Sequence, residues 1–224
     1  MFLGHYGVAL LSSRAAPRAS LGVLFAASQL VDLIWPIFLL AGVERMRITR
    51  GENPFLHLVF EHYPWTHSLV MGIVWAIVAG GLYRVVSRNA RGAAVVAALV
   101  ISHWFLDWIT HVPDLPLYPG GVEYGLGVWR SSALTLAIEV PLFLVGLWIY
   151  ASRTRGRDRI GGVGFWILAA LLLVIQGANA MSPPPPSVRM VAWTALMAWL
   201  FPLWAWWVDR HRDRIGVEVV DERG

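Results

Sequence analysis

The sequence predicts an all-α, polytopic membrane protein: a helical bundle of about six transmembrane helices, preceded by a short N-terminal helix that enters the membrane. Hydrophobic residues make up 57% of the 224 residues and charged residues only 14%, which is less charge than a soluble domain of this size would expose. Several apolar runs are long enough to cross a hydrocarbon core, which takes about 20 residues. All 18 basic residues are arginines, and they gather between these runs.

The apolar runs follow one another along a single domain. The predicted spans cover residues 20–43, 68–87, 92–112, 131–151, 161–180 and 188–208. The first 13 residues lack the basic start of a signal peptide, and His5 interrupts their apolar run. We therefore interpret them as a short helix that enters the membrane. The predicted domain comprises residues 1–208, and residues 209–224 form a tail.

The arginines also predict the orientation of the chain. With alternating connections, 13 of the 18 fall on one side of the membrane. The other side receives Arg45, Arg47, Arg50, Arg130 and Arg189. By the positive-inside rule the arginine-rich side is cytoplasmic. We therefore expect a multi-pass cell-membrane protein with a cytoplasmic C-terminus. The lipid bilayer is its expected partner, and because the basic residues lie in loops we expect no nucleic-acid partner.

Ionisable residues inside the spans are the first functional signal. Each costs about 2.5 to 3.5 kcal/mol on insertion scales, so each is a functional hypothesis. Six occur within or at the edge of the predicted membrane segments: His5, Asp32, His67, His103, Asp107 and Glu139. Counted from the nearest cytoplasmic arginine at about 1.5 Å per residue, they share a band of roughly 12 Å between the bilayer centre and the outer face. A shared depth predicts one site.

The spacing in the third span indicates a metal site. His103 and Asp107 are four residues apart, and His111 and Asp114 continue the same helix face. Metal sites in the cores of helical bundles are built from such pairs. The chain contains no cysteine, so the ligands would be nitrogen and oxygen atoms. We expect a divalent metal, zinc in the first place, with manganese or iron as alternatives.

Other interpretations of single residues stay open. Any one of these side chains can serve as an interhelical hydrogen-bonding group. His111 can simply end its helix, and Glu139 can serve a proline kink or a water pocket. His57 lies between the spans, and we interpret it as a loop or interfacial residue.

Four short motifs occur in order along the first 120 residues: Gly4-His5, Asp32–Pro36, His62–Ser68 and Ser102–Asp107. In this arrangement the chain resembles the membrane-bound metal-dependent hydrolases, a family that includes a LexA-regulated inner-membrane protein. That family is similar, remotely, to zinc-dependent phospholipase C. The resemblance implies these metal ligands: His5, Asp32, His62, His67, His103 and Asp107. The second motif departs from the family pattern, because Ile34 and Trp35 replace a carboxylate and a histidine. His111, Asp114 or Glu139 would replace the lost ligands.

We therefore predict a membrane-embedded metal-dependent hydrolase that acts from the non-cytoplasmic side on a phosphoester or another lipid-like substrate. Glu139 and Asp114 are the candidates for the catalytic base. Ser68, beside His67, is a candidate for positioning the substrate. The alternatives are a transporter or channel for divalent cations or protons and a non-enzymatic structural membrane protein. The cytoplasmic thirds of the spans, such as Val95–Leu99, contain no ionisable residue, which argues against a transport path.

Overall fold

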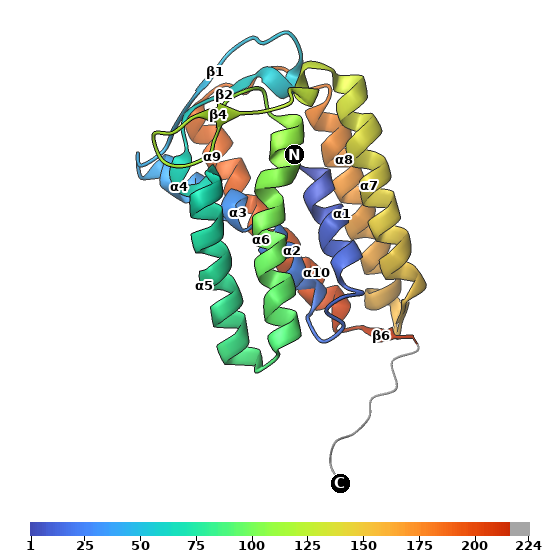
Figure 1. The fold of residues 1–224 in the computed structure, drawn as a ribbon. Helices are drawn as coiled ribbons and strands as arrows, with labels where there is room; N and C mark the ends of the chain where they lie inside the picture. The colour runs from blue at the N-terminus through green and yellow to red at the C-terminus, as the bar shows by residue number, and fades with distance from the viewer. Residues whose placement is uncertain (216–224) are drawn as a thin grey trace.

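The computed structural model describes residues 1–215 and forms a bundle of long helices (Figure 1). Five helical segments have the length and hydropathy needed to cross a membrane: α5 (Leu69–Ser87), α6 (Ala90–Thr110), α7 (Ser132–Ser152), Ile160–Asn179, which contains α8 (Phe165–Asn179), and Val188–Asp209, which contains α9 (Val188–Leu196) and α10 (Leu200–Asp209). A bent helix pair near the N-terminus brings the number of possible spans to six. The predicted all-α polytopic fold is therefore confirmed.

The first predicted span is broken into α2 (Leu21–Ser28) and α3 (Leu30–Leu40), whose axes differ by 55°. The break is at Gln29, whose φ of −107° and ψ of 6° lie outside the helical region. The prediction of one continuous helix over residues 20–43 is therefore wrong, because the segment consists of two helices with a bend between them. The break frees the carbonyl of Ser28, which becomes a hydrogen-bond partner for a histidine of α6.

The predicted N-terminal helix is also confirmed, as α1 (Leu3–Ser12), and it lies inside the bundle. It packs closely on α7, where two glycines meet. A Cβ atom added to Gly146 would lie 2.2 Å from the carbonyl oxygen of Gly7, and one added to Gly7 would lie 2.8 Å from the carbonyl oxygen of Leu142. Small residues let two helix backbones approach in a membrane. These glycines hold α1, and with it His5, against the neighbouring helix.

Gly146→Leu is therefore expected to separate α1 from α7 and to destabilise the fold by about 1 to 3 kcal/mol, the usual cost of overpacking. Thermal unfolding of the detergent-purified protein should show a lower midpoint. Gly177→Leu in α8 is the matched control, because a Cβ atom there meets nothing within 4 Å. Equal midpoints for the two variants would contradict the proposed packing.

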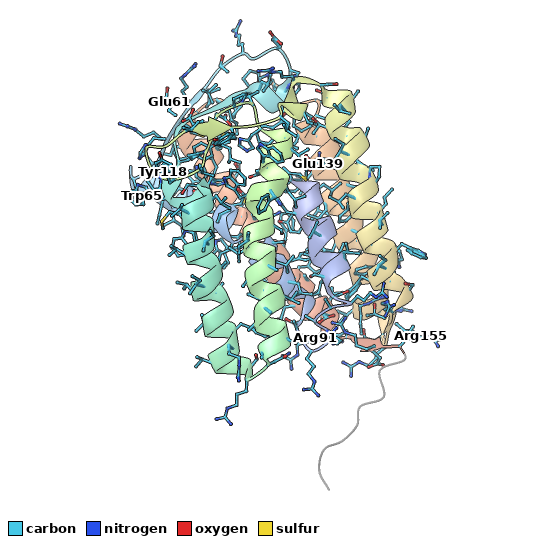
Figure 2. All side chains as sticks on the ribbon, in the orientation of Figure 1. Glu61, Trp65, Arg91, Tyr118, Glu139 and Arg155 are labelled. Atoms are coloured by element: carbon cyan, nitrogen blue, oxygen red, sulfur yellow. The ribbon has the colours of Figure 1, made fainter. Side chains whose placement is uncertain are left out.

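Short strands and turns close the two ends of the bundle. At one end, antiparallel β1 (Arg45–Ile48) and β2 (Leu58–His62) lie near β3 (Leu115–Pro116) and β4 (Glu123–Tyr124), which also pair. Three short helices lie in the same loops: Pro54–Leu56 between β1 and β2, α4 (Pro64–His67) after β2, and Val128–Arg130 after β4. The N-terminus lies within the bundle, on the side of α1 that faces this end (Figure 1). Figure 2 places Glu61, Tyr118 and Glu139 in this half of the molecule, and Arg91 and Arg155 at the opposite end. We call the strand-capped end of β1 to β4 the outer end.

The opposite end carries the strand pair of β5 (Thr154–Gly156) and β6 (Arg212–Arg214). β6 belongs to the predicted tail, so the first part of that tail is held against the bundle. Asp209 accepts a hydrogen bond from the backbone amide of Leu21 at 3.0 Å, which ties α10 to α2. Residues 216–224 of the predicted tail lie outside the described residues.

Candidate metal centre

Two triads of imidazole and carboxylate groups meet between α1, α3, α4 and α6. The first consists of His5, His103 and Asp107, and the second of Asp32, His67 and His103. Within each triad the candidate ligand atoms all lie within 4.8 Å of one another. Five of the residues singled out by depth and spacing therefore come together in space, and His103 belongs to both triads.

His103 is held in a form suited to binding metal. Its Nδ1 lies 2.8 Å from the carbonyl oxygen of Ser28, which can only accept, so Nδ1 carries the ring proton. Its Nε2 lies 3.1 Å from Asp107 Oδ2 and 3.7 Å from Asp32 Oδ2. Among residues 1–215 this buried Nε2 has no hydrogen-bond partner. A histidine whose second nitrogen is fixed by a backbone carbonyl, with the first facing carboxylates, is typical of metal ligands.

The remaining members of the triads show similar pairings. Nε2 of His67 lies 3.1 Å from Asp32 Oδ1, and Nε2 of His5 lies 3.1 Å from Asp107 Oδ1, which also contacts the amino group of Met1. The rings of His5 and His103 are stacked with their centroids 3.7 Å apart. Only Asp32 is appreciably open, with 35% of its side chain exposed. The donors are nitrogen and oxygen atoms, the set that zinc, manganese and iron accept.

A cavity of about 570 Å³ connects this cluster with the outer loops. Its ionisable side chains are those of Asp32, His57, His67, Asp107, His111 and Glu139, and Met1, which carries the amino terminus, also lines it. Its apolar lining includes Trp35, Phe55, Phe60, Trp129, Met190 and the prolines Pro183 to Pro186. This size and this mixture of apolar walls with a few convergent polar groups are typical of sites for small molecules.

Glu139 occupies a defined position on the cavity wall. Its Oε2 accepts hydrogen bonds from the backbone amides of Phe2 at 2.9 Å and Gly4 at 3.2 Å. Its Oε1 is buried and has no hydrogen-bond partner in the part of the chain that the structure describes. One oxygen therefore anchors the start of α1, and the other remains available.

His111 lies beside the triads and is paired with Asp114. Nδ1 of His111 lies 2.9 Å from Asp114 Oδ1, and Nε2 lies 3.8 Å from Asp107 Oδ2. The hydroxyl of Tyr63 reaches both residues, at 3.3 Å from His111 Nδ1 and 3.0 Å from the carbonyl oxygen of Asp114. Asp114 is thus engaged with His111 and Tyr63, and it does not line the cavity.

Two further predicted residues, like Asp114, belong neither to a triad nor to the cavity lining. His62 ends β2, where it pairs with Arg45, and belongs neither to a triad nor to the cavity lining. The chain turns at Tyr63, which places the ring of Tyr63, rather than that of His62, beside His111. The buried hydroxyl of Ser68 accepts the backbone amide of Met71 and caps α5, and Ser68 does not line the cavity either.

Three features of the site were not predicted. His57, which we interpreted as a loop or interfacial residue, is 8% exposed and lines the cavity. The prolines Pro183 to Pro186 line it as well. Glu44 is fully buried and accepts hydrogen bonds from the backbone amide and the hydroxyl of Thr66. Burial raises the pKa of the Glu44 carboxyl, while the nearby imidazole of His67 and these hydrogen bonds oppose the rise. In the sequence, the only feature that could have pointed to Glu44 is its position as an acidic residue directly after a predicted span.

Residues 2–182 match the family described as YdjM inner membrane protein. The match covers most of the chain, so the chain belongs to the YdjM inner membrane protein family. No curated protein and no solved structure matches the chain. The family supports a multi-pass protein of the inner membrane, in a lipid bilayer. The cytoplasmic position of the C-terminus stays a prediction.

The family match corrects the resemblance drawn from the four short motifs. The relationship to the membrane-bound metal-dependent hydrolases, and through them to zinc-dependent phospholipase C, is wrong, because the match is to the YdjM inner membrane protein family. The motifs fix few positions, and one departure has a structural reason. Trp35 stands where the pattern has a histidine, and its buried ring packs in the apolar cluster at the outer end.

Proposed function

We propose that this member of the YdjM inner membrane protein family is a metal-dependent hydrolase that cleaves a lipid-like phosphoester within the outer half of the membrane. The observation that carries the proposal is the pair of triads that share His103 and that reach the wall of an apolar cavity through Asp32, His67 and Asp107. The proposal stands on this geometry and does not depend on the motif resemblance.

The donor set fits a divalent cation. Nδ1 of His103 is committed to Ser28, so only its Nε2 can bind, and one nitrogen lone pair binds one ion. We therefore place one ion at His103, between Asp32 and Asp107. His5 and His67 complete the donor set from either side. A cation bound there would neutralise charge on the scissile group and lower the pKa of a nearby water molecule.

Other residues of the cavity would carry the remaining tasks. The free Oε1 of Glu139 is placed to accept a proton, while the two amides on Oε2 hold the side chain still. His57 and His111 line the same cavity and offer donors for phosphoester oxygens. The aromatic and proline walls match an apolar chain. Together these groups fit an amphipathic substrate with an anionic head.

The apolar core on the other side of the site favours an enclosed catalytic site and argues against a transport path. Val96, Leu99 and Leu147 lie on the side of the site away from the outer end and are buried in the larger apolar core cluster. A path for cations or protons would need polar or hydrated groups at these positions.

A chelator experiment tests the proposed function. Detergent-purified protein should release product from lipid phosphoesters, such as a phosphatidic acid or a lipid pyrophosphate. Because the cation supplies the charge stabilisation, a chelator should abolish this release, and added zinc, manganese or iron should restore it. Hydrolysis that continues undiminished after complete removal of metal would contradict the proposal.

A further inference from the structure

A buried chain of polar groups leads from the outer end to the metal centre. Glu44 is fully buried, and Thr66 and His67 are only 1% and 5% exposed. Oε1 of Glu44 accepts the backbone amide of Thr66 at 2.9 Å, and Oε2 accepts its hydroxyl at 2.8 Å. The same hydroxyl oxygen lies 2.7 Å from Nδ1 of His67. Burying a carboxylate is costly unless its oxygens accept hydrogen bonds. Here Thr66 donates to both oxygens of Glu44.

The direction of each hydrogen bond follows from which of these groups can donate a proton and which can only accept one. An ionised carboxylate only accepts, so the hydroxyl proton of Thr66 points to Glu44. The other acceptor near this hydroxyl, the carbonyl oxygen of Tyr63 at 3.4 Å, is more distant. Only lone pairs of the hydroxyl then remain for His67, so Nδ1 must carry the ring proton and donate it. In a neutral imidazole this leaves Nε2 without a proton.

The position of the ring proton decides how Nε2 of His67 interacts with Asp32. The unprotonated Nε2 of His67 lies 3.1 Å from Asp32 Oδ1, and two acceptors that close require a positive charge between them. A metal cation bound by both groups supplies that charge. The hydrogen bond from Nδ1 to Thr66 therefore leaves Nε2 as the ring nitrogen of His67 that is available to a metal.

We infer that Glu44 is a positioning residue that sets the tautomer of His67 through Thr66 and thereby tunes the metal affinity of the site. The inference rests on the proposed function, in which His67 is a ligand. Glu44 touches neither metal nor substrate in this scheme. Outer-shell groups of this kind typically contribute about 10- to 100-fold in metal affinity.

The isosteric substitution Glu44→Gln tests the inference. The backbone amide of Thr66 can only donate, so the carbonyl oxygen of the new side chain must face it. The amide NH₂ then donates to the Thr66 hydroxyl, which turns its own proton toward Nδ1 of His67. The ring proton moves to Nε2, so metal binding there must first return the proton to Nδ1, which weakens it. We expect a zinc affinity about 10- to 100-fold weaker, and ¹⁵N chemical shifts of the ring that report the opposite tautomer in metal-free protein.

Two sets of controls keep the result interpretable. Glu61→Gln makes the same change at an exposed carboxylate of β2, which pairs with Arg47, and should alter neither readout. Thr66→Ser keeps the hydroxyl and should keep the affinity of the unsubstituted protein. Thr66→Val removes the hydroxyl and should lose affinity, which provides a second test if Glu44→Gln does not fold.

The outcomes separate this inference from the proposed function. Unchanged tautomer and unchanged zinc affinity in Glu44→Gln would overturn the role of Glu44, and so would equal affinities in Thr66→Ser and Thr66→Val. If the unsubstituted protein binds no metal while Glu44→Gln still switches the tautomer, the proposed function fails and the proton arrangement stands, without its effect on affinity.

Discussion

His103→Ala is expected to leave the purified protein without tightly bound divalent metal. His103 is the one residue common to both triads, and its Nε2 faces the carboxylates of Asp32 and Asp107. Removing a direct ligand should cost more than the roughly 10- to 100-fold loss that follows from an outer-shell change. Elemental analysis after gel filtration in detergent measures the metal content.

His62→Ala is the matched control for this experiment. It removes another histidine of the outer half, one that the structure places outside the triads and the cavity lining. Its metal content should equal that of the unsubstituted protein. Full occupancy in His103→Ala would refute the metal centre, and equal losses in both variants would remove the support for the ligand assignment.

Glu139→Gln is expected to slow hydrolysis by about 100- to 10,000-fold, the usual contribution of a general base, while the metal remains bound. The substitution keeps one oxygen to accept the backbone amides at the start of α1, but it removes the unpaired oxygen that would take the proton. Metal content and the midpoint of thermal unfolding should be measured beside the rate, so that a loss of structure is recognised.

Glu123→Gln, on β4 at the outer surface, provides the comparison for Glu139. Glu123 is exposed and does not line the cavity, so its substitution should leave the rate unchanged. A variant of Glu139 that retains metal and cleaves at the original rate would show that another group accepts the proton.

The sequence predicted the helices and part of the site for identifiable physical reasons. Hydropathy alone located the spans, because only long apolar runs can satisfy their backbone polar groups in lipid. It could not locate the break at Gln29, since a local change of backbone angles leaves the hydropathy of the run unchanged. The depth of ionisable residues grouped His5, Asp32 and the α6 pair correctly, because helix rise converts residue number into height.

The outer part of the site could not be predicted in the same way. His57 and the prolines Pro183 to Pro186 lie in loops, whose path has no periodicity from which a position follows. Glu44 and Thr66 are 22 residues apart, and their contact depends on the antiparallel pairing of β1 with β2, which brings together the residues before β1 and after β2. His62 is the opposite case. It was assigned as a metal ligand by resemblance to a motif, but it ends β2, and the chain turns at Tyr63, so His62 lies outside the triads and the cavity lining.

X-ray absorption spectroscopy of the unsubstituted, detergent-purified protein tests the metal centre most directly. We predict about one divalent ion per chain, with nitrogen and oxygen neighbours near 2.0 to 2.2 Å, as is usual for zinc, and with the multiple-scattering signal of imidazole rings. A protein that contains no divalent metal, or one whose metal has no imidazole neighbours, would contradict the assignment of His5, His67 and His103 as ligands.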